Sequence, residues 1–245
     1  MRRFLVCSGV DGRPKSLEWL RQAVEKRSPD GILFAGGVLD GARLYSRDPA
    51  ALTHEEGRFV EHFFETLGNL GVFSAVIPGP ADGPLEEFLR IGMHAEVESP
   101  AVHLAHATLL ERGELAVSGV GGKIGQEVSV IMAQYHLRSL WTAKQPHRIL
   151  LLATPPTGAL GGPEGSSVVG DFIDSYHPAL CVVGGPSQCR GSQRVAKTLV
   201  INPGRLAEGW AAWFDWNRQA DDAVEMLNLR ELSPKSVALD IGGGD

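Results

Sequence analysis

The sequence predicts an α/β fold, and three observations lead to this prediction. Short apolar and β-branched runs alternate with amphipathic stretches through the first hundred residues, which is the order of strands and helices in an open α/β sheet. Each predicted strand ends in glycine or proline before the next helix begins, so the loops should lie along one edge of the sheet. Near residue 101 the pattern changes to two strands joined by a tight turn, so a second sheet or an antiparallel edge begins there.

The predicted elements follow one another without an internal repeat or a long linker. In order, we expect strands at 4–8, 31–37 and 72–79 that alternate with helices at 16–27, 55–71 and 83–92, then a hairpin within 102–122, a helix at 128–143, a strand at 148–153, a helix at 166–176, and strands at 179–185, 196–202, 209–216 and 223–230. Residues 1–231 are predicted to form a single domain. Residues 232–245 lack periodicity and are predicted to form a flexible C-terminal tail.

Composition and charge exclude several classes of protein. Hydrophobic residues make up 43% of the chain and charged residues 21%, which is ordinary for a globular protein. No apolar run approaches the roughly 20 residues that span a bilayer, so no membrane association is expected. The formal net charge of −6 argues against a general nucleic-acid surface, which needs clustered Lys and Arg. The N-terminus lacks the apolar segment of a secretory signal and the three cysteines are scattered, so we expect a cytoplasmic location.

Five loops at predicted strand ends occur in a recognisable order. The blocks are VCSGVDG, DGILFAGGVLD, AVIPGPADGP, ILLLATPP, and CVVGGPS followed by TLVINPG. Together they resemble the calcineurin-like metallophosphoesterase family over residues 4–204. The resemblance implies a two-sheet sandwich flanked by helices, a four-layer αββα arrangement in which these loops share one edge.

The resemblance also implies where the metal ligands of the family would lie. The family pattern runs Asp-x-His-Gly, Gly-Asp, Gly-Asn-His-Asp, a His before prolines, and Gly-His-x-His. Its seven ligand positions fall on Gly9, Asp11, Gly37, Pro80, Thr154, Gly185 and Ser187. Of these, Asp11 alone has a carboxylate or an imidazole, whereas a two-metal phosphoesterase needs several such ligands to hold its ions about 4 Å apart. We therefore predict no dinuclear metal centre.

Asp11 lies in the turn Gly-Val-Asp-Gly, which leaves two interpretations open. In the first, it is an exposed turn or cap residue. In the second, Asp11, Asp40 and Asp82 follow strands at one edge and form an acidic pocket, where Asp11 and Asp82 would bind Ca²⁺ or Mg²⁺ weakly. The residues predicted to line a cleft at this edge are Gly9, Asp11, Gly37, Asp40, Pro80, Asp82, Thr154, Gly185 and Ser187.

Two functions follow from these observations. The first is a phosphoesterase-fold protein that has lost dinuclear metal-dependent hydrolysis and binds a small-molecule ligand or a protein partner through the cleft. Its ligand could be an anion that Arg43, Lys123 and Arg190 hold without metal. The alternative is an active phosphoesterase with an atypical metal site. The sequence assigns no catalytic residue, ligand or oligomeric state.

Overall fold

The computed structural model describes residues 1–42, 51–122, 137–140, 142–218 and 222–232, and their strands form two six-stranded sheets. The first sheet contains β1 (Arg3–Cys7), β2 (Gly31–Ala35), β3 (Phe73–Ile77), β4 (Val102–Leu104), β11 (Trp210–Asp215) and β12 (Val224–Asn228). The second contains β5 (Leu109–Arg112), β6 (Leu115–Val120), β7 (His147–Leu152), β8 (Leu180–Val183), β9 (Gly191–Val195) and β10 (Thr198–Asn202). The strand orders are β12-β11-β1-β2-β3-β4 and β5-β6-β7-β8-β10-β9.

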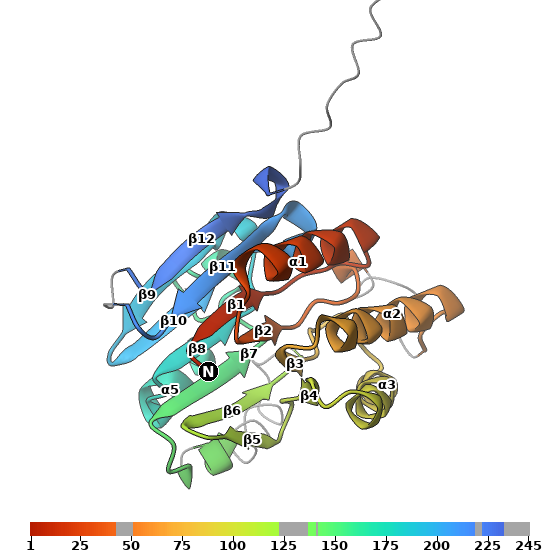
Figure 1. Cartoon of the computed structure of the whole chain (residues 1–245). Helices are drawn as coiled ribbons and strands as arrows, with labels where there is room; N and C mark the ends of the chain where they lie inside the picture. The colour runs from red at the N-terminus through yellow and green to blue at the C-terminus, as the bar shows by residue number, and fades with distance from the viewer. Residues whose placement is uncertain (43–50, 123–136, 141, 219–221, 233–245) are drawn as a thin grey trace, which may run out of the picture.

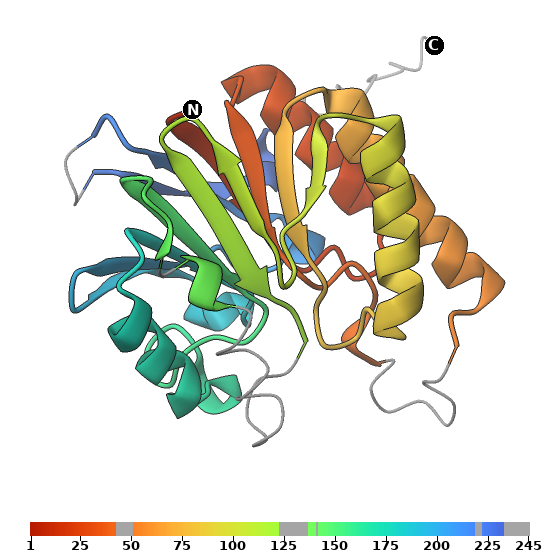
Figure 2. The same cartoon turned by 90° about the horizontal axis from the view of Figure 1, so that it is seen from below.

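Helices cover the outer face of each sheet (Figures 1 and 2). The first sheet carries α1 (Pro14–Arg27), α2 (His54–Leu70) and α3 (Leu85–Glu98), and the second carries α5 (Ser167–Tyr176). Alternate residues of β1 serve two cores, because successive side chains of a strand point to opposite faces. Leu5 and Cys7 pack toward the helices, whereas Phe4 and Val6 pack toward the second sheet. The predicted two-sheet sandwich flanked by helices is therefore confirmed.

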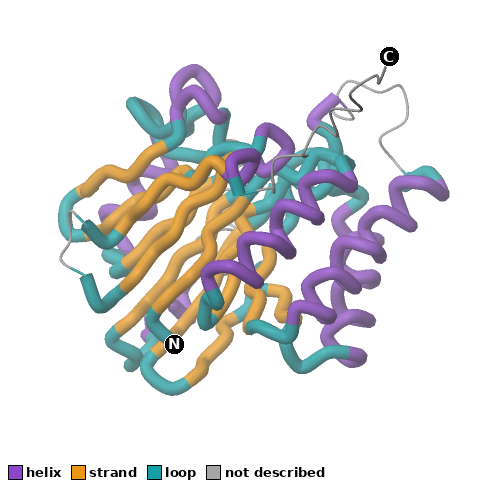
Figure 3. The backbone as a smooth tube through the Cα atoms, turned by 45° about the horizontal axis from the view of Figure 1, so that its top comes forward, coloured by secondary structure: helices purple, strands orange, loops and turns teal. Residues whose placement is uncertain are grey.

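Figure 3 shows the helices beside the strands of the sheets. Local signals in the sequence explain where one of these helices, α2, begins and ends. The hydroxyl of Thr53 accepts a hydrogen bond from the backbone N–H of Glu56, whose carboxylate accepts one from the N–H of Thr53. This capping box satisfies two of the N–H groups that a helix start leaves without partners. The helix ends at Gly71, whose φ of 66° suits glycine.

Two strands differ from the expectation. The predicted hairpin is confirmed as β5 and β6, but the residues before it form β4, which joins the first sheet parallel to β3. Residues 191–195 were expected to be loop and form β9, an edge strand. Their sequence GSQRV is mostly exposed in the structure, so it has no apolar alternation that could reveal a strand.

Some predictions fall on residues that the structure does not describe. Most of the helix expected at 128–143 lies outside the described residues, although 137–140 are helical. Residues 233–245 of the predicted tail also lie outside them, and the single-domain assignment stays a prediction. Among the helices of the described residues, none combines the length and the apolar character that a membrane crossing requires.

Candidate functional site

Loops from both sheets meet at the edge where the parallel strands end. The hydroxyl of Ser8, which follows β1, donates a hydrogen bond to the carbonyl of Gly204, which follows β10, over 2.9 Å. The backbone N–H of Ala207 donates to the carbonyl of Gly9 over 2.7 Å. Segments that are almost 200 residues apart in the sequence are therefore side by side at this edge, where ligands bind in open α/β sheets.

Glycines allow the loops after β2 and β3 to touch. Gly36 and Gly37 have φ values of 81° and 84°, which strongly favour glycine. A Cβ atom added to Gly79 would lie 2.3 Å from the backbone nitrogen of Gly37, and one added to Gly36 would lie 2.7 Å from the Cα of Gly79. The backbones are therefore in direct contact, with no room for a side chain between them.

Asp82, in the loop after β3, stabilises this contact through hydrogen bonds. Its fully buried carboxylate accepts four backbone hydrogen bonds. Oδ2 accepts from Gly79 at 2.6 Å and from Gly37 and Val38 at 3.0 Å each, and Oδ1 accepts from Leu39 at 2.7 Å. Burial raises the pKa of Asp82, and the four N–H donors oppose that rise. Asp82 therefore acts as an internal acceptor that holds the β2 loop against the β3 loop.

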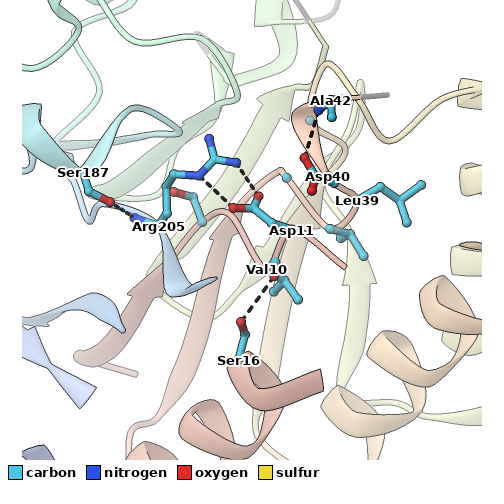
Figure 4. Close-up of polar contacts among 12 residues, drawn as sticks. Val10, Asp11, Ser16, Leu39, Asp40, Ala42, Ser187 and Arg205 are labelled. Carbon is cyan, nitrogen blue, oxygen red and sulfur yellow. Dashed lines mark hydrogen bonds and ion pairs between the residues drawn. The ribbon is translucent and has the colours of Figure 1, made fainter. Parts of the chain in front are cut away.

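Asp11 forms a two-point ion pair with Arg205 (Figure 4). Nε of Arg205 lies 2.8 Å from Oδ2 of Asp11, and Nη2 lies 2.6 Å from Oδ1. Burial raises the pKa of Asp11, the neighbouring charge of Asp40 adds to the rise, and Arg205 opposes it. Because Asp11 follows β1 and Arg205 follows β10, the pair connects the two sheets. Asp11 is therefore a buried residue in an ion pair. The interpretation of Asp11 as an exposed turn residue is wrong about its exposure, but its φ of 56° is a turn conformation.

The backbone around Arg205 is held in place as well. Its N–H donates to Oγ of Ser187 over 2.9 Å, as Figure 4 shows, and the side chain of Ser187 is buried. On the opposite side, a Cβ atom added to Gly9 would lie 3.0 Å from Cβ of Arg205. The side chain of Arg205 remains 34% exposed. The side chain of Arg205 is therefore fixed in direction by Asp11 and remains partly exposed.

Asn202 organises the loops that surround Arg205. Its buried Nδ2 atom lies within 2.8–3.3 Å of the carbonyl oxygens of Leu160, Pro186 and Cys189, to which it donates. Its Oδ1 atom accepts the backbone N–H of Gly204 over 2.9 Å. One amide therefore connects three loops of the second sheet and fixes the residue that precedes Arg205.

Arg190 lies next to this assembly. The centre of its guanidinium is 3.7 Å from the ring centre of Trp210, a cation–π distance. Nη1 of Arg190 donates to the carbonyl of Ser187 over 2.9 Å. Ser187 therefore contacts Arg190 through its carbonyl and Arg205 through its hydroxyl.

The remaining predicted residues fall into three groups. Thr154 donates to the carbonyl of Gly122, whose N–H donates to the carbonyl of Pro78, so this loop approaches the β3 loop. Asp40 is exposed and accepts the N–H of Ala42 over 2.9 Å (Figure 4). In the last group, Pro80 is exposed and Gly185 contacts the side chain of Asn202. Arg43 and Lys123 lie outside the described residues. That these residues line a cleft stays a prediction.

Sequence reasoning missed Arg205, and it identified Asn202 only as part of the strand-end motif Asn-Pro-Gly. Arg205 comes directly after the strand-end motif Asn-Pro-Gly, and a charged residue at that place is a signal that could have drawn attention to it. Its partner Asp11 lies 194 positions away, so the pairing itself has no local signal. Within the described part of the chain, no group of three or more His, Cys, Asp or Glu side chains is placed to hold a metal ion.

Comparisons with known proteins agree with this architecture. The protein TT1561 of Thermus thermophilus is 26% identical and superimposes with a TM-score of 0.78, over 94% of this chain and 99% of that one. An archaeal phosphodiesterase (12% identity, TM-score 0.50, 92% and 98% coverage) shares the fold alone. So does GAP50 of Plasmodium, described as the anchor in the inner membrane complex (10% identity, TM-score 0.55, 95% and 86% coverage).

Sequence comparison identifies the family. Among curated protein sequences, none matches the chain. The family model described as "Metallophosphoesterase, calcineurin superfamily" matches residues 1–225, almost the whole chain. The two packed sheets and the strand-end loops at one edge agree with this family. The chain therefore belongs to the calcineurin superfamily of metallophosphoesterases.

Proposed function

We propose that this protein binds an anionic ligand at the strand-end edge and does not hydrolyse phosphoesters with a pair of metal ions. The observation that carries the proposal is the ion pair between Asp11 and Arg205. Arg205 brings a positive charge to the one family ligand position that has a carboxylate. An arginine there supplies the kind of charge that a cation would supply, without a metal ion.

The donors at this edge do not fit the pair of metal ions that the family implies. Asp11 is bound by Arg205 through both of its oxygens. The carboxylate of Asp82 accepts four backbone N–H groups and is fully buried. Thr154 and Ser187 offer neutral hydroxyls, which bind transition ions poorly. A metal ion would have to displace an existing partner from each carboxylate.

The backbone leaves little room for the missing carboxylates. A Cβ atom at Gly37 would lie 3.0 Å from the Cα of Gly9, and one at Gly9 would lie 3.0 Å from Cβ of Arg205. Both residues have positive φ, 84° for Gly37 and 65° for Gly9, which side chains rarely adopt. Aspartate at either position would therefore need the loops to move apart. This geometry favours a site built without those ligands.

An anion suits the groups that remain. Arg205 and Arg190 reach this edge from loops that Ser187 connects, and Arg13 is close enough to act on the charge of Asp11. Arginine side chains bind phosphate and carboxylate groups through charge-assisted hydrogen bonds. We therefore propose a small phosphate-bearing or carboxylate-bearing ligand, free or displayed by a protein partner.

The first test measures metal content and hydrolysis. We expect the purified protein to contain fewer than two tightly bound Mn, Fe or Zn ions per chain. We also expect it to leave phosphomonoesters and phosphodiesters intact in the presence of Mn²⁺, Mg²⁺ or Ca²⁺. Elemental analysis and a substrate panel measure both. Two tightly held transition ions, or hydrolysis that Asp11→Ala abolishes, would contradict the proposal.

The second test measures anion binding in metal-free protein. Inorganic phosphate, titrated by calorimetry in the presence of EDTA, should bind the wild type about tenfold more tightly than Arg190→Ala, because the substitution removes a charge-assisted contact. Arg230→Ala is a matched control, since Arg230 also lies over a tryptophan, Trp19, at 6.0 Å. Equal affinities of all three proteins would rule out a role for Arg190.

One observation favours the alternative, an active phosphoesterase with an atypical metal site. Burial raises the pKa of Asp11, and the charge of Asp40 adds to that rise. Both carboxylates follow strands at this edge, Asp11 after β1 and Asp40 after β2. Oxygen ligands of this kind suit Ca²⁺ or Mg²⁺, with dissociation constants on the order of 10⁻⁴ to 10⁻³ M for so few charges. Calcium binding that Asp11→Ala and Asp82→Ala both weaken, accompanied by Ca²⁺-dependent hydrolysis, would support this alternative.

A further inference from the structure

Helix α3 exposes a row of large apolar side chains. Leu85 is 45% exposed, Met93 60% and Val97 87%, and together with Met1 these are the large apolar side chains that the described residues expose. Leu85, Leu89, Met93 and Val97 follow one another at intervals of four, so they lie along one side of the helix. Leu89 is partly buried against the core. The row extends over about 18 Å at the rise of an α-helix.

A groove adjoins this row. It lies between α2 and α3, is open to solvent and has a volume of about 700 Å³. Its lining includes the apolar side chains of Phe64, Ile91 and Ala95. Its polar lining consists of Glu61, Glu65 and Asn69 from α2, Arg90, His94 and Glu98 from α3, and Ser99, which follows α3. Met93 and Val97 lie three positions after Arg90 and His94 of the lining, and residues three apart are neighbours on a helix surface. The apolar row therefore borders the groove along its α3 side.

The charge of the protein is concentrated on the same two helices. Helices α2 and α3 together contain eight glutamates and two arginines, a formal charge of −6. The formal net charge of the whole chain is also −6, so positive and negative residues balance over the rest of the sequence. An apolar row between strongly acidic flanks is unusual for a surface that contacts only water.

We propose that this surface, which we call the α2–α3 face, is a docking site for a basic amphipathic helix of a partner protein. The apolar side of such a helix would cover Met93 and Val97, and its flanking Lys and Arg side chains would meet Glu61, Glu65 and Glu98. Helices bind grooves in this way through apolar residues at i, i+3, i+4 and i+7. The charge selects the partner, because complementary potentials favour a basic helix over a neutral one.

The same charge disfavours two other occupants. A second copy of the chain would bring its own acidic helices against these, and like charges across an interface are repulsive. An anionic membrane surface attracts basic segments rather than acidic ones. The proposal is independent of the anion site, because the strand-end edge and the α2–α3 face share none of the residues named.

The experiment uses a fluorescent 18-residue peptide of Leu and Lys in an amphipathic helical pattern, and a second peptide of the same composition in shuffled order. Fluorescence anisotropy should give an affinity for the amphipathic peptide at least tenfold higher than for the shuffled one. The double substitution Met93→Ser, Val97→Ser should lower the affinity for the amphipathic peptide at least tenfold. Both side chains are exposed, so the fold should be unaffected, which circular dichroism verifies.

A pair of double substitutions tests the role of charge. Glu61→Lys, Glu65→Lys should lower the affinity at least tenfold. The control is the double substitution Asp171→Lys, Asp174→Lys, which changes the net charge by the same amount. Both aspartates are exposed on α5, which covers the other sheet. This variant should keep its affinity for the amphipathic peptide within twofold of the wild type.

Several results would overturn the proposal. One is an equal affinity for the amphipathic and the shuffled peptide. Another is an equal loss of affinity in the α2 charge variant and the α5 charge variant. The third is an unchanged affinity in the Met93→Ser, Val97→Ser variant. Analytical ultracentrifugation and flotation with phosphatidylcholine vesicles address the other occupants. If the protein dimerises and Met93→Ser, Val97→Ser abolishes the dimer, the α2–α3 face binds a second copy instead. If the protein binds the vesicles and the same substitution abolishes this binding, the face binds a membrane instead.

Discussion

We expect the Asp82→Ala substitution to lower the free energy of unfolding by about 3 to 5 kcal/mol, because a buried donor left without an acceptor costs about 1 to 3 kcal/mol and Asp82 has several such donors. Four backbone N–H groups donate to the Asp82 carboxylate, which is fully buried. The substitution would leave all four without this acceptor. Each buried donor without a partner is costly, and the loops after β2 and β3 would have to open to let water reach them. Urea denaturation followed by circular dichroism measures the change.

Asp40→Ala is the matched control for this substitution. Asp40 is also an aspartate in a strand-end loop, but it is exposed and accepts a single N–H, that of Ala42. Its replacement should change the free energy of unfolding by no more than about 0.5 kcal/mol, as for most surface substitutions. If Asp82→Ala were no more destabilising than Asp40→Ala, the assignment of Asp82 as the acceptor that holds the two loops together would be wrong.

The Gly79→Ala substitution should destabilise the protein by about 3 kcal/mol or more. The added Cβ would lie 2.3 Å from the backbone nitrogen of Gly37, and neither backbone can yield as a flexible side chain could. Overpacking of well-packed places typically costs about 1 to 3 kcal/mol, and here the same shift would also stretch the hydrogen bonds of Asp82. Thermal and urea denaturation measure the loss.

Gly57→Ala provides the comparison for Gly79→Ala. Gly57 lies in α2, and a Cβ added there would meet nothing within 4 Å. Alanine is preferred over glycine in a helix by up to about 1 kcal/mol, so this substitution should leave the stability unchanged or raise it. A destabilisation of similar size in both variants would mean that the loss does not come from the contact between the loops.

The overall architecture could be predicted because it depends on local patterns. Apolar runs followed by glycine or proline located the central strands β1, β2 and β3, and the resemblance of the strand-end motifs to the metallophosphoesterase family implied the two-sheet sandwich. The strand β9 could not be found in this way, since an exposed edge strand needs no apolar face. Its pairing with β10 is a property of the folded neighbour and not of its own sequence.

For the candidate site, the sequence predicts where two carboxylates lie in the fold but not which groups bind them. Asp11 and Asp82 were correctly placed in strand-end loops, because the position of a loop follows from the strand before it. Their partners could not be read from the sequence. A carboxylate after a strand can bind a metal ion, a guanidinium or backbone N–H groups, and the choice depends on residues such as Arg205 and Leu39 that fold against it from elsewhere.

The position of β1 in the first sheet has a consequence for synthesis on the ribosome. The first strand of the chain lies between β2 and β11, and its pairing with β11 needs residues 210–215. At roughly 5 to 20 residues per second, β1 waits on the order of 10 to 40 s for that neighbour. Until then one side of β1 is an open edge that can pair with another nascent chain. The edge of β1 is therefore open to mispairing until the last strands of the sheet have been synthesised.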